Sequence, residues 1–138
     1  MDLTGFLTAR LDEDEQAARQ CDGQRWDFTG AASPEVRIRE DDGDLGRVVA
    51  YCRDGGDATA EFSRAIHIAC FDPARVLREV EAKRKILAWH ICEFVRAPQP
   101  GVRYQCSGCS QEWWPCQTLE ALAAVWSDHP DYDRAWKA

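Results

Sequence analysis

Three cysteines in the last third of the chain have the spacing of metal ligands. Cys106 and Cys109 are separated by two residues, the spacing at which two thiolates converge on one ion, and Gly108 allows the tight backbone bend that this requires. Cys116 follows Pro115 at the start of a predicted helix, where free amides and the positive end of the helix dipole stabilise a thiolate. Three thiolates with this spacing predict a structural zinc ion.

A fourth ligand has to come from elsewhere in the chain, and the two candidates are His90 and Cys92. Both lie near the end of a predicted long helix, where their side chains would point about 200° apart, so only one of them can face the cysteines. His90 shares a predicted inward side with Ile86 and Phe94, and neutral imidazole binds zinc well. We therefore predict His90 as the ligand, with Cys92 as the alternative.

The remaining cysteines have simpler interpretations. His67 and Cys70 stand one helical turn apart and could bind a metal together, but packing beside a core explains both. Cys21 and Cys52 are expected to be small buried residues or surface thiols. The chain holds seven cysteines, and the odd number without an export signal favours reduced thiols and a metal site over a disulfide framework.

Charge and hydropathy exclude some classes of function. The net charge of −7 argues against nucleic-acid binding, which needs clustered basic residues to neutralise phosphates. No apolar run approaches the roughly 18 residues that span a bilayer, and the acidic N-terminal segment does not resemble a signal peptide, so we expect a cytoplasmic protein. Basic and acidic residues alternate along one predicted helix, which indicates ion pairs one turn apart (Arg75, Arg78, Glu79, Glu81, Lys83, Arg84, Lys85).

The sequence lacks the common catalytic motifs. It contains no H-E-x-x-H, no G-x-S-x-G and no phosphate-binding glycine loop. A hydrolytic zinc ion would also need an open coordination position, and four protein ligands leave none. Trp113 and Trp114 are expected to shield the metal from water. These features favour a protein that is not an enzyme.

The elements that position these residues predict a single α+β domain over 1–138, mostly helical. Thr59 is expected to cap one helix, and Asp72 with Pro73 to start the next. Trp26 and Phe28 are expected to cover one face of a β-hairpin. Apolar periodicity and turn residues predict helix 4–20, β-hairpin 35–52, helices 59–71 and 73–95, a zinc knuckle with a final helix over 102–126, and a tail over 127–138 that docks on the core through Tyr132 and Trp136.

Three segments carry a resemblance to a known family. FLTARLDEDEQAA (6–18), DPARVLREVEAKRKIL (72–87) and WPCQTLEALAAVWSDHPDY (114–132) resemble small uncharacterised proteins of actinobacteria and their phages, a domain of unknown function. The resemblance implies a bacterial cytoplasmic setting and no particular reaction. It also implies a histidine at the position of His90 in the most similar relatives, and a metal that stabilises the fold, since some relatives lack the cysteines.

Three functions are compatible with the sequence. The first is a non-enzymatic, zinc-stabilised accessory module that binds another protein through its acidic or tryptophan-bearing surface. The second is an iron–sulfur redox sensor, in which Cys92 joins Cys106, Cys109 and Cys116 as the fourth thiolate. The third is a zinc ribbon that binds nucleic acid through a patch of Arg75, Arg78 and Arg103, which the overall acidity disfavours.

Overall fold

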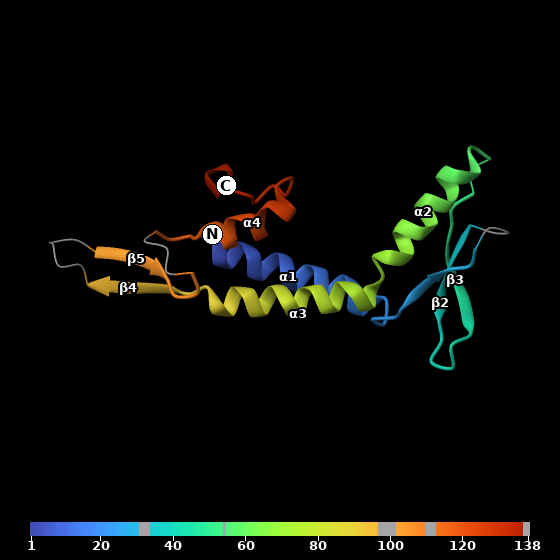
Figure 1. Ribbon diagram of the computed structural model, residues 1–138, viewed down its shortest axis with the longest axis horizontal. Coiled ribbons are helices and arrows are strands. Elements are labelled where there is room, and N and C mark those ends of the chain that lie inside the picture. Colours follow the sequence, from blue (N-terminus) through green and yellow to red (C-terminus); the bar gives the residue numbers. More distant parts are fainter. Residues whose placement is uncertain (31–33, 54, 97–101, 110–112, 137–138) are drawn as a thin grey trace. The chain divides into compact units, whose positions relative to one another are not determined.

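The computed structural model describes residues 1–30, 34–53, 55–96, 102–109 and 113–136, with backbone alone at 95–96 and 102–103. Within these ranges the fold is α+β, as expected, with helices and two small antiparallel sheets (Figure 1). The elements in order are α1 (Leu3–Gln20), β1 (Trp26–Phe28), β2 (Glu35–Arg39), β3 (Leu45–Tyr51), α2 (Ala58–Cys70), α3 (Pro73–Trp89), β4 (Cys92–Arg96), β5 (Val102–Cys106), α4 (Gln117–Ala123) and the short 3₁₀ turns η1 (Ala124–Trp126) and η2 (Arg134–Trp136).

Backbone contacts divide the chain into two compact units. Unit 1 comprises residues 1–13 and 80–138, and unit 2 comprises residues 14–79, so the division falls within α1 and α3. The single domain expected over 1–138 stays a prediction. Among the helices that the structure describes, none combines the length and apolar character needed to cross a bilayer.

Unit 1 has a core that α1 and α4 build together. Phe6 and Leu7 of α1 are fully buried, and so is Leu119 of α4. The apolar residues of each helix recur at intervals of three or four, which places them on one side of the helix. The full core cluster is Leu3, Phe6, Leu7, Cys106, Cys116, Leu119 and Ala123. Two predicted metal ligands are therefore also core residues.

The C-terminal tail docks on this core, as expected from its aromatic residues. The ring of Phe6 lies 5.9 Å from that of Tyr132 and 5.2 Å from that of Trp136. Arg10 is buried beside them, donates to Glu13 Oε1 at 2.7 Å and lies 2.6 Å from Nε2 of His129. The guanidinium thus holds the tail against α1. Residues 137–138 of the predicted tail lie outside the described residues.

Unit 2 contains a three-stranded antiparallel sheet in the order β1, β2, β3, with α2 packed against it. The predicted hairpin over 35–52 is confirmed by the pairing of β2 with β3. Trp26 and Phe28 do pack against the core of this unit, but as part of a third strand, which the sequence analysis did not anticipate. Val36 and Ala65 are fully buried where the sheet meets α2.

Helix caps follow the local sequence closely. Asp57, one residue before α2, accepts a hydrogen bond from the Thr59 amide at 2.7 Å, so Asp57 is the cap and the predicted role of Thr59 is wrong. An aspartate is at least as good an acceptor as threonine and precedes it in the chain. Asp72 caps α3 as predicted, accepting from the Arg75 amide at 2.6 Å.

The predicted helix over 73–95 is wrong beyond Trp89. The chain leaves the helix there, and β4 pairs with β5 in an antiparallel hairpin. Phe94, predicted to face inward, is 64% exposed, and Ile91 is 56% exposed. The short apolar segment that contains them fits a helix or a strand, and a strand partner at 102–106 satisfies the backbone hydrogen bonds that a helix would otherwise make. The other predicted helices, 4–20 and 59–71, agree with α1 and α2 to within one residue.

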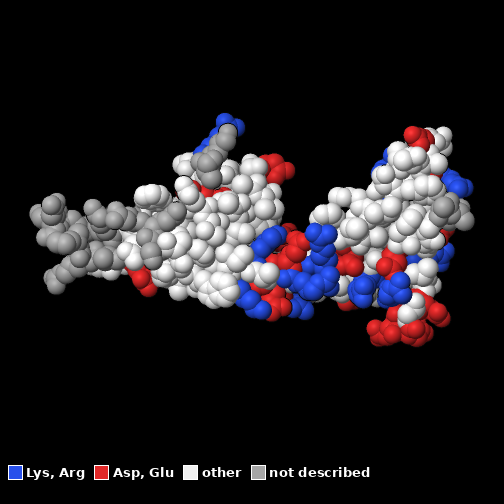
Figure 2. All heavy atoms as spheres, viewed as in Figure 1, with Lys and Arg blue, Asp and Glu red and all other residues white. Residues whose placement is uncertain are grey.

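Ion pairs along α3 also match the expectation. Arg75 pairs with Glu79 and Lys85 with Glu81, both at 2.7 Å and one turn apart. Figure 2 shows the two signs of charge intermingled in this region of the surface. Such exposed pairs stabilise a helix only slightly, and a mixed surface lacks the uniform basic field that attracts nucleic acid.

We expect Phe6→Ala to lower the free energy of unfolding of unit 1 by about 3–5 kcal/mol, because the fully buried ring fills the space between α1 and the tail. Every tryptophan except Trp26 belongs to unit 1, so tryptophan fluorescence in a Trp26→Phe background reports its unfolding in denaturant. The matched control, Phe94→Ala, removes an exposed ring and should change stability by no more than about 0.5 kcal/mol. Equal effects of the two changes would contradict this core.

Candidate metal centre

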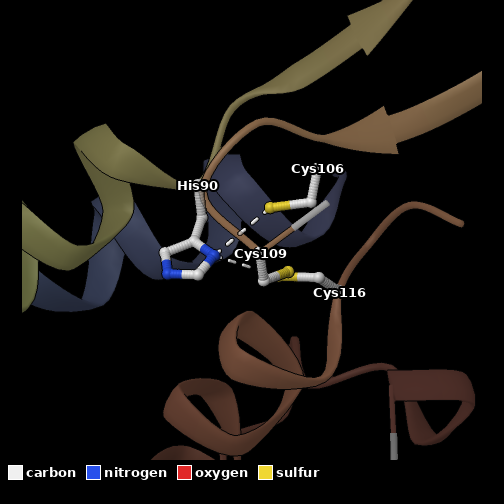
Figure 3. Close-up of side chains that lie close together, drawn as sticks. All are labelled: His90, Cys106, Cys109 and Cys116. Carbon is white, nitrogen blue, oxygen red and sulfur yellow. Dashed lines mark hydrogen bonds between the residues drawn. The ribbon is translucent and has the colours of Figure 1, made fainter. Parts of the chain in front are cut away.

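The four residues predicted as metal ligands come together in unit 1. One ligand atom from each of His90, Cys106, Cys109 and Cys116 lies within 4.8 Å of all the others, and we call this group the Cys/His cluster (Figure 3). His90 follows the end of α3, Cys106 ends β5, Cys109 lies in the turn after it and Cys116 precedes α4. The cluster therefore joins three segments of the chain, and it could hold a metal ion.

His90 faces the sulfur atoms through Nδ1. This nitrogen lies 3.2 Å from Sγ of Cys106 and 3.4 Å from Sγ of Cys116. The His90 amide still donates to the carbonyl of Ile86 at 3.2 Å, so the last turn of α3 fixes the direction of the side chain. The prediction of His90 as a ligand rests on a helix that runs to residue 95. The residue joins the cluster, but for a different reason: the helix stops just before it.

The turn that carries Cys106 and Cys109 is fastened to the end of α3 by Ser107. Its amide donates to the Ile91 carbonyl at 3.0 Å, and its hydroxyl accepts from the Ile91 amide and donates to the Trp89 carbonyl, both at 3.1 Å. Sequence reasoning missed this role. The signal was a small hydroxyl residue inside a C-x-x-C turn, a residue type that often bonds nearby backbone.

Gly108 is required by close packing against the same helix end. A Cβ atom at this position would lie 2.6 Å from the carbonyl oxygen of Trp89 and 3.1 Å from Nδ1 of His90. The sequence analysis expected this glycine to provide a tight bend. The structure adds that the turn presses directly on the backbone that presents His90, so the absence of a side chain sets the distance between them.

Burial differs among the three thiols. Cys106 and Cys116 are fully buried, whereas Cys109 is exposed. Burial raises the pKa of the Cys106 thiol, but hydrogen bonds with the Cys109 backbone and with the side chains of Cys109, Cys116 and His90 outweigh it and lower that pKa to about 7. The pKa of the Cys116 thiol is raised to about 11, chiefly by burial and also by neighbouring Cys106 and Cys109, against the lowering effect of the Leu119 amide.

These pKa values show that the cluster by itself stabilises one thiolate better than two. A second negative charge in the same buried space is opposed by desolvation and by repulsion from the first. A bound cation would remove both penalties, because it neutralises the sulfur atoms and replaces their lost hydration. The arrangement thus has the electrostatic character of a cation site.

Cys92 does not belong to the cluster. It pairs with Cys106 across the β4–β5 hairpin, but it is exposed and is not among the ligand atoms that converge. His67 packs its ring on Phe71 at 4.7 Å, but both His67 and Cys70 are exposed, so the prediction that they pack beside a core is wrong. Neither belongs to a group of three or more converging ligands among the described residues.

The two adjacent tryptophans have different surroundings. Trp114 packs against the core cluster that contains Cys106 and Cys116, as expected for a residue that shields the site. Trp113 is 56% exposed. Of the two, Trp114 is therefore the one that contributes to the apolar surroundings of the core cluster that contains the buried cysteines.

We expect Gly108→Ala to weaken metal binding about 10- to 100-fold, since the added methyl group would push the Cys106–Cys109 turn away from Trp89 and His90. Competition against a chromophoric chelator measures this affinity. Thr118→Ala, on the exposed side of α4, is the control and should leave the affinity unchanged. An unaltered affinity in Gly108→Ala would show that this contact does not position the ligands.

Comparison with known proteins gives a family but no activity. No curated protein and no solved structure matches the chain. The source of the protein in actinobacteria or their phages stays a prediction. A family model described as a family of unknown function, DUF6221, matches residues 1–138. Because that match spans the whole sequence, the chain belongs to the family of unknown function DUF6221.

Proposed function

We propose that the Cys/His cluster binds one structural zinc ion. Three thiolates and one imidazole form a common tetrahedral zinc donor set. With zinc bonds of ~2.3 Å to sulfur and ~2.05 Å to nitrogen, tetrahedral geometry separates a sulfur from a nitrogen by about 3.6 Å. The observed Nδ1 to sulfur distances of 3.2 and 3.4 Å are close to this value, so small movements would complete the coordination.

The surroundings support a structural ion. Four protein ligands leave no open position for water or substrate, and two of the sulfur atoms are fully buried. The ion would connect the end of α3, the β4–β5 hairpin and the start of α4. A two-stranded hairpin is marginally stable by itself, and a metal bond at its base would hold it to the rest of unit 1.

We further propose that unit 1 binds another protein through apolar residues around the metal centre. Among the residues of 89–113 whose side chains the structure describes, five large apolar or aromatic ones are more than half exposed: Trp89, Ile91, Phe94, Tyr104 and Trp113. Phe94 and Tyr104 lie opposite each other in the hairpin and contact edge to face at 6.5 Å. Exposed aromatic residues on a fixed scaffold are typical of binding surfaces, because they add contact area without losing much side-chain freedom.

Metal analysis of anaerobically purified protein tests the site. We expect about one zinc ion per chain, a loss of zinc in His90→Ala and in Cys116→Ser, and lower thermal stability of unit 1 after loss. Cys92→Ser is the matched control, because Cys92 is exposed and outside the cluster. It should keep its zinc. A coloured protein that holds iron and loses it in Cys92→Ser would instead establish the iron–sulfur alternative.

The binding surface is tested by Phe94→Ser combined with Tyr104→Ser. Cross-linking in native extract identifies a partner, and calorimetry with the purified partner then measures affinity, which we expect to fall by at least about 30-fold, or roughly 2 kcal/mol. Tyr51→Ser, a 70% exposed aromatic of unit 2, serves as the control, and zinc content should be unchanged in both.

Two outcomes would contradict the proposed function. The first is full partner affinity in the double variant, which would place the binding surface elsewhere. The second is turnover of nucleic acids, nucleotides or esters by the zinc-loaded protein, which would make it an enzyme. A duplex affinity that falls steeply with added salt would support the nucleic-acid alternative instead.

A further inference from the structure

One cysteine of the Cys/His cluster is exposed while the other two are fully buried. Cys109 is exposed, and Cys106 and Cys116 have no exposed surface. A small oxidant can therefore reach the cluster at a single ligand. We propose that the metal centre is a peroxide-responsive switch in which Cys109 is oxidised, forms a disulfide with Cys106 and so releases the ion. This inference rests on the structural zinc ion proposed above.

The geometry favours Cys106 as the partner of Cys109. The two residues share one C-x-x-C turn, their side chains are hydrogen-bonded, and their sulfur atoms lie within the 4.8 Å limit of the cluster. A disulfide needs a sulfur–sulfur distance of about 2.05 Å, so a modest rotation of exposed Cys109 closes the gap. Cys116 enters from a different segment, before α4.

The chemistry requires only peroxide as oxidant. The Cys109 thiolate attacks one peroxide oxygen, the O–O bond breaks, and the departing hydroxide takes a proton to become water. The Cys106 thiolate then attacks the sulfenic sulfur, and a second hydroxide leaves and is protonated. Two thiolates lose two electrons in total, and one hydrogen peroxide becomes two molecules of water. The ion keeps only His90 and Cys116, too few ligands to hold zinc tightly.

Loss of the ion should loosen a limited part of unit 1. Ser107 still fastens the turn to Trp89 and Ile91, and Leu119 still packs in the core. Cys116, however, would no longer be linked through the zinc ion to the turn that carries Cys106 and Cys109. The residues at 106–109 and 113–116 should therefore exchange their amide hydrogens faster after oxidation, while the helices remain formed.

The experiment uses the full zinc-loaded chain with Cys21, Cys70 and Cys92 changed to serine, because these exposed thiols would otherwise consume peroxide. Zinc content before treatment tests the proposed structural site separately. After addition of hydrogen peroxide, a chromophoric chelator measures released zinc, and mass spectrometry of unreduced peptides identifies the linkage. We expect one zinc ion released per chain, a Cys106–Cys109 disulfide, and recovery of zinc binding after treatment with a thiol reductant.

The matched variant is Cys109→His, which keeps a zinc-binding side chain and removes the accessible sulfur. We expect its peroxide-driven release of zinc to be at least about tenfold slower. Zinc retained by the parent chain under peroxide, or a linkage that excludes Cys109, would overturn the proposal. The disulfide is identified in the parent chain, so this test of the proposal does not depend on how well the Cys109→His variant folds.

Discussion

The structure of unit 1 depends on two sulfur atoms that belong both to a hydrophobic core and to a candidate metal centre. Cys106 and Cys116 pack with Phe6, Leu7 and Leu119, and they also face the imidazole of His90. Apolar surroundings penalise thiolates, whereas metal binding requires them. A bound cation would resolve this conflict, because its charge would replace the hydration that the core removes. Packing and metal binding would then be one constraint, and α4 and the β4–β5 hairpin would both be subject to it.

The backbone around the cluster provides the rigidity that such a centre needs. Ser107 exchanges hydrogen bonds with Trp89 and Ile91, and Gly108 approaches the Trp89 carbonyl too closely for any side chain. These contacts join the turn to the point where α3 ends. The positions of the ligand atoms are therefore set by the backbone more than by the rotamers of flexible side chains. Less conformational entropy would then be lost when an ion binds.

Burial also separates the roles of the ligands. The fully buried thiols connect the centre to the core, while exposed Cys109 connects it to solvent. Around the same centre, Phe94 and Tyr104 present aromatic rings on the hairpin. The proposed zinc site, the oxidation of Cys109 and the binding of a partner protein would then all involve one short segment of unit 1. Loss of the ion would loosen the hairpin that carries the exposed rings.

The cysteine spacing, the start of α3 at Asp72 and the hairpin of unit 2 could be derived from the sequence, because each depends on residues a few positions apart. The end of α3 at Trp89 could not. The short apolar segment that contains Ile91 and Phe94 fits a helix or a strand, and the choice depends on pairing with residues 102–106, beyond the reach of local pattern. The same pairing brings the end of α3, and with it His90, next to the Cys106–Cys109 turn, while Cys92 stays exposed outside the cluster. Local chemistry thus set which atoms could bind a metal, and long-range backbone pairing set which of them meet.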